Sequence, residues 1–125
     1  MKVLYPAIFT PAEEGGYLVN FPDVENCFSE GDDLQEAFTN AEDVLGIMAA
    51  FYLEDHGHLP KASNIEDVHA EQGFVSLISV DLRPYLSETK LVNKTVTIPD
   101  WMNEIATRQR LNCSALLRQA ILEQL

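Results

Sequence analysis

The sequence has no long apolar segment and few cysteines. No run approaches the roughly 18 apolar residues of a membrane-spanning helix, and residues 1–10 hold a proline where a secretory signal would have an apolar core. The two cysteines, Cys27 and Cys113, lie far apart and outside any Cys-x-x-Cys or Cys/His motif. These features predict a reduced, cytoplasmic protein without a membrane segment.

Basic residues are also scarce, because eight Lys and Arg stand against twenty Asp and Glu, for a net charge of −12. Such a charge alone argues against nucleic-acid binding, which draws much of its affinity from Lys and Arg on phosphates. The charge is unevenly distributed, however. Residues 1–89 hold three basic and seventeen acidic side chains, whereas residues 90–125 hold five basic and three acidic ones. We expect the two segments to have partners of opposite charge; the alternative is a solvated acidic surface followed by a neutral tail.

Catalytic and metal-binding motifs are missing. The sequence has no Gly-rich phosphate loop and no GxSxG motif. His56, His58 and His69 lie with Asp55 in one polar segment that contains Gly and Pro, where histidines are usually solvated rather than bound to zinc or nickel. Cys27 has no histidine near it in sequence, so a small buried hydrophobic side chain is its expected role. We therefore expect no enzyme activity, no metal site and no cofactor.

The first two thirds of the chain predict a small sheet. Residues 3–9 are rich in β-formers and residues 17–21 alternate in polarity, and the Glu-Gly-Gly turn signal at residues 14–16 predicts a hairpin between them. A short third strand is expected at residues 26–29. Residues 74–82 predict a further strand, because they are rich in β-branched and aromatic residues and are apolar at Val75, Leu77, Ile78 and Val80.

One long helix is expected between these strands. Asp33 is a good N-cap, Glu36 completes a capping box, and the helix should end before Gly57. The apolar positions at helical spacing are Leu34, Ala37, Phe38, Ala41, Val44, Leu45, Met48, Phe51 and Tyr52. Residues 55–73 are predicted to form a loop. One sheet and one helical layer make an α+β domain of residues 1–86.

The C-terminal third has a different pattern. After a short polar linker at residues 87–90, residues 94–98 alternate like a strand, and Pro99 is expected at the first position of a helix over residues 100–110. Asn112 is expected to cap a second helix. The predicted order is therefore strand, helix, helix.

This small module, residues 87–125, is predicted to dimerise. Chains below about 40 residues usually need disulfides, metal or oligomerisation to fold. Its single strand could pair with the same strand of a second copy, giving a two-stranded ribbon over four helices. The residues expected in the dimer core are Val96, Ile98, Trp101, Ile105, Leu116, Leu117, Ala120 and Ile121.

The run NKTVTIPDWMNEIATRQRLNCSALLRQAILEQL resembles a ribbon-helix-helix DNA-binding module. The resemblance implies that the paired strands lie in the DNA major groove and read base edges, while the N-terminus of the second helix meets a phosphate. By alternation, Asn93, Thr95 and Thr97 would face the groove. The DNA-binding residues implied are Asn93, Lys94, Thr95, Thr97, Asn112 and Ser114.

The segment YPAIFTPAEEGGYLVNFPDVENCFSEGDDLQEAFTNAEDVL is similar to the N-terminal domain of HicB antitoxins, with its Tyr-Pro-Ala, Gly-Gly-Tyr, Phe-Pro-Asp, Gly-Asp and Glu-Ala-Phe motifs in order. This similarity implies a partial RNase H-like fold that binds and blocks a HicA toxin, a small basic mRNA-cleaving ribonuclease. Turns beside sheet edges are available for docking. The candidate toxin contacts are therefore Phe21, Pro22, Asp23 and Asp32.

Taken with the ribbon-helix-helix module, the resemblance implies an antitoxin that neutralises a toxin by contact and represses its own operon as a homodimer, leaving open whether dimers form tetramers. Two alternatives remain. One is a repressor whose acidic domain senses a small molecule. The other is a metal-dependent RNase H-like nuclease, which would need an acidic residue on the first strand, where residues 2–9 have none.

Overall fold

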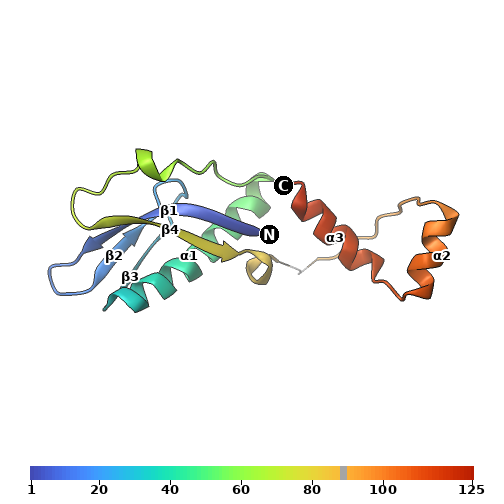
Figure 1. The fold of residues 1–125 in the computed structure, drawn as a ribbon, viewed down its shortest axis with the longest axis horizontal. Coiled ribbons are helices and arrows are strands. Elements are labelled where there is room, and N and C mark those ends of the chain that lie inside the picture. Colours follow the sequence, from blue (N-terminus) through green and yellow to red (C-terminus); the bar gives the residue numbers. More distant parts are fainter. Residues whose placement is uncertain (88–89) are drawn as a thin grey trace. The chain divides into compact units, whose positions relative to one another are not determined.

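The computed structural model describes residues 1–87 and 90–125, and the chain divides into two compact units, residues 1–87 and residues 88–125 (Figure 1). We call them unit 1 and unit 2. The boundary predicted after residue 86 lies one residue before this division. The predicted linker, residues 87–90, includes residues 88 and 89, which lie outside the described residues.

Unit 1 contains a four-stranded antiparallel sheet. Its strands are β1 (Lys2–Pro11), β2 (Tyr17–Asn20), β3 (Phe28–Gly31) and β4 (Phe74–Asp81). Their order is β3-β2-β1-β4. The predicted hairpin is confirmed, because β1 pairs Phe9 with Val19 of β2, and Gly15 and Gly16 turn the chain with φ values of 96° and 78°.

One long helix, α1 (Leu34–His56), covers one face of this sheet (Figure 1). Its predicted N-cap is confirmed, since the Glu36 N–H donates to the Asp33 carboxylate at 2.8 Å. Gly57 ends the helix with a φ of 79°. The predicted α+β arrangement of one sheet and one helical layer is therefore present.

The buried face of α1 is narrower than predicted. Its buried residues are Ala37, Ala41, Leu45, Gly46, Ala49, Ala50 and Leu53. Leu34 and Phe51, both predicted for this face, are 43% and 63% exposed. The mostly small side chains let the helix lie close to the sheet, and Phe9 fills the core by stacking on Phe38 and Phe74 at ring distances of 4.4 and 4.9 Å.

The third strand lies two residues later than predicted. It begins at Phe28, after Asn26, whose positive φ of 56° lies outside the extended region of a regular β-strand. The Phe21 N–H donates to the Cys27 carbonyl at 2.9 Å and closes the loop, while Val24 is buried inside it. Residues 21–27 are therefore a packed turn rather than the start of a strand.

Two short 3₁₀ turns were not predicted. The segment expected to be a loop, residues 55–73, contains the last residues of α1 and the turn η1 (Ile65–Asp67). A second turn, η2 (Arg83–Tyr85), follows β4. Tyr85 of η2 lies against Gly46 of α1, where an added Cβ would collide with the Tyr85 ring.

Unit 2 contains two helices, α2 (Asp100–Arg108) and α3 (Cys113–Glu123). Pro99 is the N-cap of α2 rather than its first residue, which corrects the prediction by one position. The predicted cap of α3 is confirmed, because the Ala115 N–H donates to the Asn112 side chain at 3.0 Å.

The strand predicted at residues 94–98 is absent from the described chain. These residues have no regular secondary structure, and all of their side chains are exposed. A strand is defined by hydrogen bonds to a neighbour, and no other segment of the described chain pairs with this one. The alternating pattern therefore does not produce a strand in a single copy.

Candidate functional site

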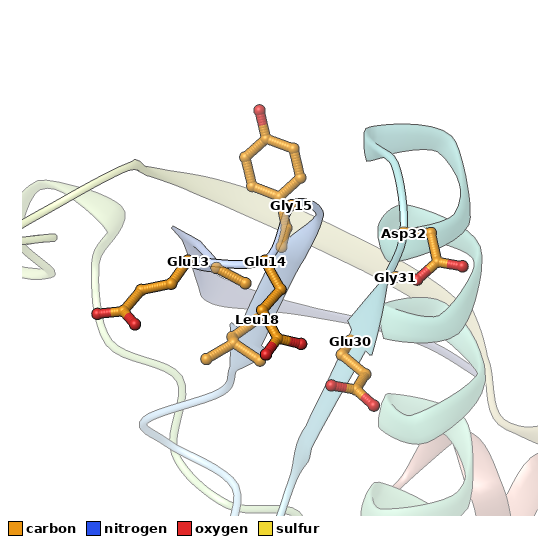
Figure 2. A pocket seen from close by; sticks show the side chains of 9 residues that line it. Glu13, Glu14, Gly15, Leu18, Glu30, Gly31 and Asp32 are labelled. Atoms are coloured by element: carbon orange, nitrogen blue, oxygen red, sulfur yellow. The ribbon is translucent and has the colours of Figure 1, made fainter.

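An open acidic cleft of about 500 Å³ lies in unit 1 between the β1–β2 turn and the end of β3 (Figure 2). The residues that line it are Ala12, Glu13, Glu14, Gly15, Tyr17, Leu18, Glu30, Gly31 and Asp32. Segments far apart in sequence meet here because the β2–β3 register pairs Tyr17 with Gly31 and Leu18 with Glu30.

Glycines allow the close approach of these segments. A Cβ on Gly16 would collide with the Gly31 carbonyl oxygen, and a Cβ on Gly31 would collide with the Ala37 backbone nitrogen at the start of α1. The turn itself is closed by a hydrogen bond from the Ala12 N–H to the Gly16 carbonyl at 3.0 Å. The cleft walls are thus set by backbone contacts.

Four carboxylates surround the cleft, on Glu13, Glu14, Glu30 and Asp32. All four side chains are exposed, and none forms an ion pair with any residue in the described part of the chain. Figure 2 shows Glu14 and Glu30 on the same side as Leu18, whose side chain is 48% exposed. A surface of unpaired carboxylates around one apolar side chain suits Lys and Arg of a basic partner.

The predicted toxin contacts fall in different environments. Asp32 lines the cleft and Pro22 is exposed. Asp23 is half-buried, and its carboxylate accepts hydrogen bonds from Ser63. Phe21 requires correction, because its side chain is only 2% exposed and belongs to the core. The alternation with Tyr17 and Val19 that placed Phe21 on a strand face also directs it inward.

The histidines form a small aromatic group at the end of α1. His56 stacks on Tyr52 at 3.9 Å, and the His58 ring lies edge-on to Tyr52 at 5.8 Å. All three histidines are exposed, as expected for solvated side chains. Within residues 1–87 and 90–125, no group of three His, Cys, Asp or Glu is arranged to hold a metal ion.

The two cysteines differ in environment. Cys27 is 1% exposed, and burial raises the pKa of its thiol to about 12. This agrees with the buried hydrophobic role predicted for it. Cys113, the first residue of α3, is exposed. Neither thiol is part of a disulfide in the described chain.

The candidate DNA-binding residues lie on unit 2. Asn93, Lys94, Thr95 and Thr97 are exposed in the segment before α2. At the start of α3, Ser114 is exposed and the Asn112 side chain is engaged as the helix cap.

No helix in the described chain is long and apolar enough to cross a membrane.

The predicted dimer-core residues leave an apolar surface on unit 2. Val96, Ile98, Trp101, Ile105, Leu116 and Ile121 are 55%, 44%, 61%, 38%, 50% and 46% exposed, Ala120 is exposed, and Leu117 is half-buried. Within residues 90–125, the single buried residue is Ala106. Unit 2 thus has almost no core in one copy of the chain.

The sequence interpretation missed Glu13, Glu14, Leu18 and Glu30 as site residues. The available signal was an acidic pair just before Gly-Gly and a second acidic run that begins at Glu30. Joining these two signals requires the register of β2 on β3, which the misplaced third strand concealed.

Comparisons with known proteins identify the family. The sequence profile described as "HicB_like antitoxin of bacterial toxin-antitoxin system" matches residues 5–121. A protein of Haemophilus phage HP1, described as an uncharacterized 14.9 kDa protein in the rep-hol intergenic region, is 35% identical over 98 residues, which cover 75% of this chain and 73% of that protein. "Antitoxin HicB 1" of Photorhabdus laumondii is 43% identical over 56 residues, or 45% of this chain and 36% of the relative.

A solved structure extends the similarity over the whole fold. A chain of the "Toxin-Antitoxin complex from Streptococcus pneumoniae" is 30% identical, with a TM-score of 0.63 and coverage of 100% of both chains. The profile match and the phage relative each span most of the sequence. The chain therefore belongs to the HicB-like antitoxin family of bacterial toxin–antitoxin systems.

Proposed function

We propose that this protein is a cytoplasmic antitoxin that binds and neutralises a HicA-like mRNA-cleaving toxin through unit 1 and represses its own operon by binding operator DNA through unit 2. The observation that carries the proposal is the division of surface chemistry between the units. Unit 1 presents the acidic cleft, whereas unit 2 presents an apolar surface beside exposed Thr and Asn side chains. The similarity to a chain of a toxin–antitoxin complex supports a toxin partner.

The cleft of unit 1 is the proposed toxin site. A protein that binds RNA carries a basic surface, and a strongly acidic domain attracts and steers such a partner. The four carboxylates of the cleft can accept charge-assisted hydrogen bonds from Lys or Arg, and Leu18 adds an apolar contact. Of the residues proposed from sequence, Asp32 and Pro22 remain contact candidates.

Unit 1 is proposed to be a partial RNase H-like domain without nuclease activity. Two-metal nucleases of that kind hold their ions with carboxylates at the centre of the sheet. The central strand β1 carries no acidic residue, and the cleft carboxylates lie on the β1–β2 turn and around β3. This arrangement supports contact with a partner, rather than metal-dependent hydrolysis, as the role of the acidic groups.

Unit 2 is proposed to form a ribbon-helix-helix homodimer. Residues 94–98 of two copies would pair as antiparallel strands, giving each the partner that it lacks in one chain. Burying a large apolar side chain contributes about 1.5–3 kcal/mol, so pairing would gain substantially from covering Ile98, Trp101 and Ile105. The other members of the proposed core are Val96, Leu116, Leu117, Ala120 and Ile121.

The opposite face of the proposed ribbon would contact the operator. Asn93, Thr95 and Thr97 would reach base edges in the major groove, where Asn pairs with adenine and Thr contacts thymine methyl groups. Lys94 would neutralise a phosphate. The start of α3, at Asn112 and Ser114, would offer backbone N–H groups to another phosphate.

Co-expression with the product of an adjacent small basic reading frame tests this function. The tagged chain should capture that product in a stable complex, and the complex should not cleave mRNA until the antitoxin is removed. If the two proteins do not associate, while the chain still shifts its own promoter DNA, the toxin assignment is wrong and a simple repressor explains the family fold. RNA cleavage by the chain alone that stops in EDTA would instead identify a nuclease.

A further inference from the structure

The two edges of the unit 1 sheet are protected very differently. The β3 edge is four residues long, contains Glu30, and is followed directly by Asp32 and Asp33. The β4 edge is eight residues long, and no residue from Phe74 to Val80 is charged. Natural sheets keep open edges short or charged, because a long uncharged edge pairs with other strands.

The outer edge of β4 is open in the described chain. β4 has β1 as its neighbour on one side and no strand on the other. Although α1 packs against β4 and η1 lies near it, no backbone hydrogen bond from any segment other than β1 reaches β4 among the described residues. Leu77, in the middle of the strand, is 42% exposed. The edge thus combines free backbone groups with an exposed apolar side chain.

The charges near the end of β4 are locally balanced. Asp81 accepts a hydrogen bond from the Arg83 guanidinium at 2.7 Å and lies 3.4 Å from the amino terminus of Met1. Lys2 faces Asp81 across the β1–β4 ladder. Two of the three basic residues of unit 1 therefore lie at this corner, whereas the uncompensated carboxylates line the cleft beside β3.

We propose that β4 pairs antiparallel with β4 of a second copy of the chain, with Leu77 facing Leu77 of that copy. This register places Val75 opposite Ser79 and Ser76 opposite Ile78, so that a small side chain meets a larger one at both of these pairs, and Phe74 falls opposite Val80. Asp81 falls opposite Gly73 of the second copy, so no like charges face each other.

A second copy fits this edge better than a charged partner does. An uncharged strand offers a basic protein no electrostatic attraction, whereas two acidic copies can approach each other where their surface charge is lowest. The contact is separate from the dimer proposed for unit 2, because it uses main-chain groups and side chains of unit 1 alone. The antitoxin would then have two self-interfaces, one in each unit.

Cysteine cross-linking of the full chain tests the pairing. In a Cys113→Ser background, which leaves only the buried Cys27, Leu77→Cys should give a disulfide-linked dimer on mild oxidation, because facing residues in antiparallel strands lie within disulfide distance. Leu18→Cys is the matched control: it is similarly exposed but lies on an inner strand, and it should stay monomeric on a non-reducing gel. Equal cross-linking of the two variants, or of neither, contradicts the proposal.

A second measurement does not depend on the register. Leu77→Lys adds a charge to an exposed edge position, so the fold should persist while pairing is lost. Amide hydrogen exchange over residues 74–81 should then accelerate by at least about tenfold, with exchange in the β1–β2 hairpin unchanged. Identical exchange over residues 74–81 in the variant and the wild type would overturn the proposal.

A third variant separates this interface from unit 2. Ile98→Asp should abolish the unit 2 dimer proposed above, yet it should leave the Leu77→Cys cross-link intact. Persistence of the cross-link supports pairing within unit 1. Its loss would assign the contact to unit 2 and contradict the β4 interface.

Discussion

The Asp23 carboxylate accepts two hydrogen bonds from Ser63, one from the backbone N–H at 2.9 Å and one from the hydroxyl at 2.6 Å. The bonds join the turn between β2 and β3 to the segment that follows α1, 40 residues later in the chain. A second link lies close by, because the Tyr5 hydroxyl donates to the Pro60 carbonyl. Asp23 therefore fastens one loop of unit 1 to another, and both of its oxygens are engaged within the chain.

Asp23→Ala should lower the stability of unit 1 without a specific loss of toxin binding. Removing a charged acceptor with two partners at a half-exposed site should cost about 1 kcal/mol in the free energy of unfolding. Urea denaturation followed by circular dichroism measures this cost. Asp32→Ala is the matched control: it should leave stability unchanged and weaken toxin binding, because Asp32 lines the cleft and bonds to no other side chain in the described residues. The reverse pattern would make Asp23 the contact.

Operator binding should depend on the strand face and on dimerisation separately. Thr95→Ala combined with Thr97→Ala should weaken specific binding by about 1–3 kcal/mol per lost base contact, with the dimer intact. Ile98→Asp should abolish dimerisation through unit 2 and DNA binding together, because an unpaired charge would enter the apolar core. Light scattering and gel-shift assays at matched salt distinguish the two variants. Wild-type operator affinity in the threonine variant would refute readout by the ribbon.

The two thiols should differ sharply in reactivity. Cys113 is exposed, whereas burial raises the pKa of Cys27 to about 12, so the Cys27 thiolate is nearly absent at pH 8 to 9. Iodoacetamide should therefore modify Cys113 alone in the native chain and both residues in urea. Mass spectrometry of native and denatured samples gives the answer, and rapid native labelling of Cys27 would show that the core opens readily.

Protonation of Asp81 should lower the stability of the protein in acid. The hydrogen bond from the Arg83 side chain, helped by the Arg83 backbone N–H, holds the pKa of this carboxyl well below its usual value of about 3.9. A lowered folded-state pKa means that the stabilisation is complete above about pH 4 and is lost as the pH falls below it. Asp81→Asn should therefore flatten the fall in the urea midpoint below about pH 4. Glu71→Gln, an exposed change in the loop before β4, is the control and should retain the wild-type slope.

Local sequence signals predicted the elements whose ends are set by neighbouring residues. The Asp33 and Asn112 caps and the Gly15-Gly16 turn were all found in place, because each depends on hydrogen bonds or φ angles within a few positions. Phe21 was predicted as a toxin contact because it begins a turn beside a sheet edge, and that prediction was wrong because its side chain is 2% exposed. The sequence alone does not show which turn residues pack into the core.

Features that depend on a distant segment of the chain, or on a partner strand that one copy lacks, were not predictable in the same way. The acidic cleft forms through the pairing of Leu18 with Glu30, and an error of two residues in the third strand was enough to hide it. Residues 94–98 have the alternation of a strand but no partner in a single copy, so the pattern has no ladder to join. In the first case tertiary pairing decides what local propensity leaves open, and in the second, alternation alone does not produce a strand in one copy.

Neutralising two equal sets of acidic residues tests the central claim, that toxin is neutralised at the acidic cleft. The cleft variant carries Glu13→Gln, Glu14→Gln, Glu30→Gln and Asp32→Asn. The control removes the same net charge from exposed positions elsewhere in unit 1, by Glu42→Gln, Asp55→Asn, Glu66→Gln and Glu71→Gln. Both full-length proteins are titrated against the mRNA-cleaving activity of the toxin at matched salt. The account predicts that the cleft variant binds at least about tenfold more weakly, a loss of about 1.4 kcal/mol, while the control stays within about twofold of the wild type. Equal losses in both variants would mean that net charge alone attracts the toxin, and an unchanged cleft variant would place the toxin on another surface.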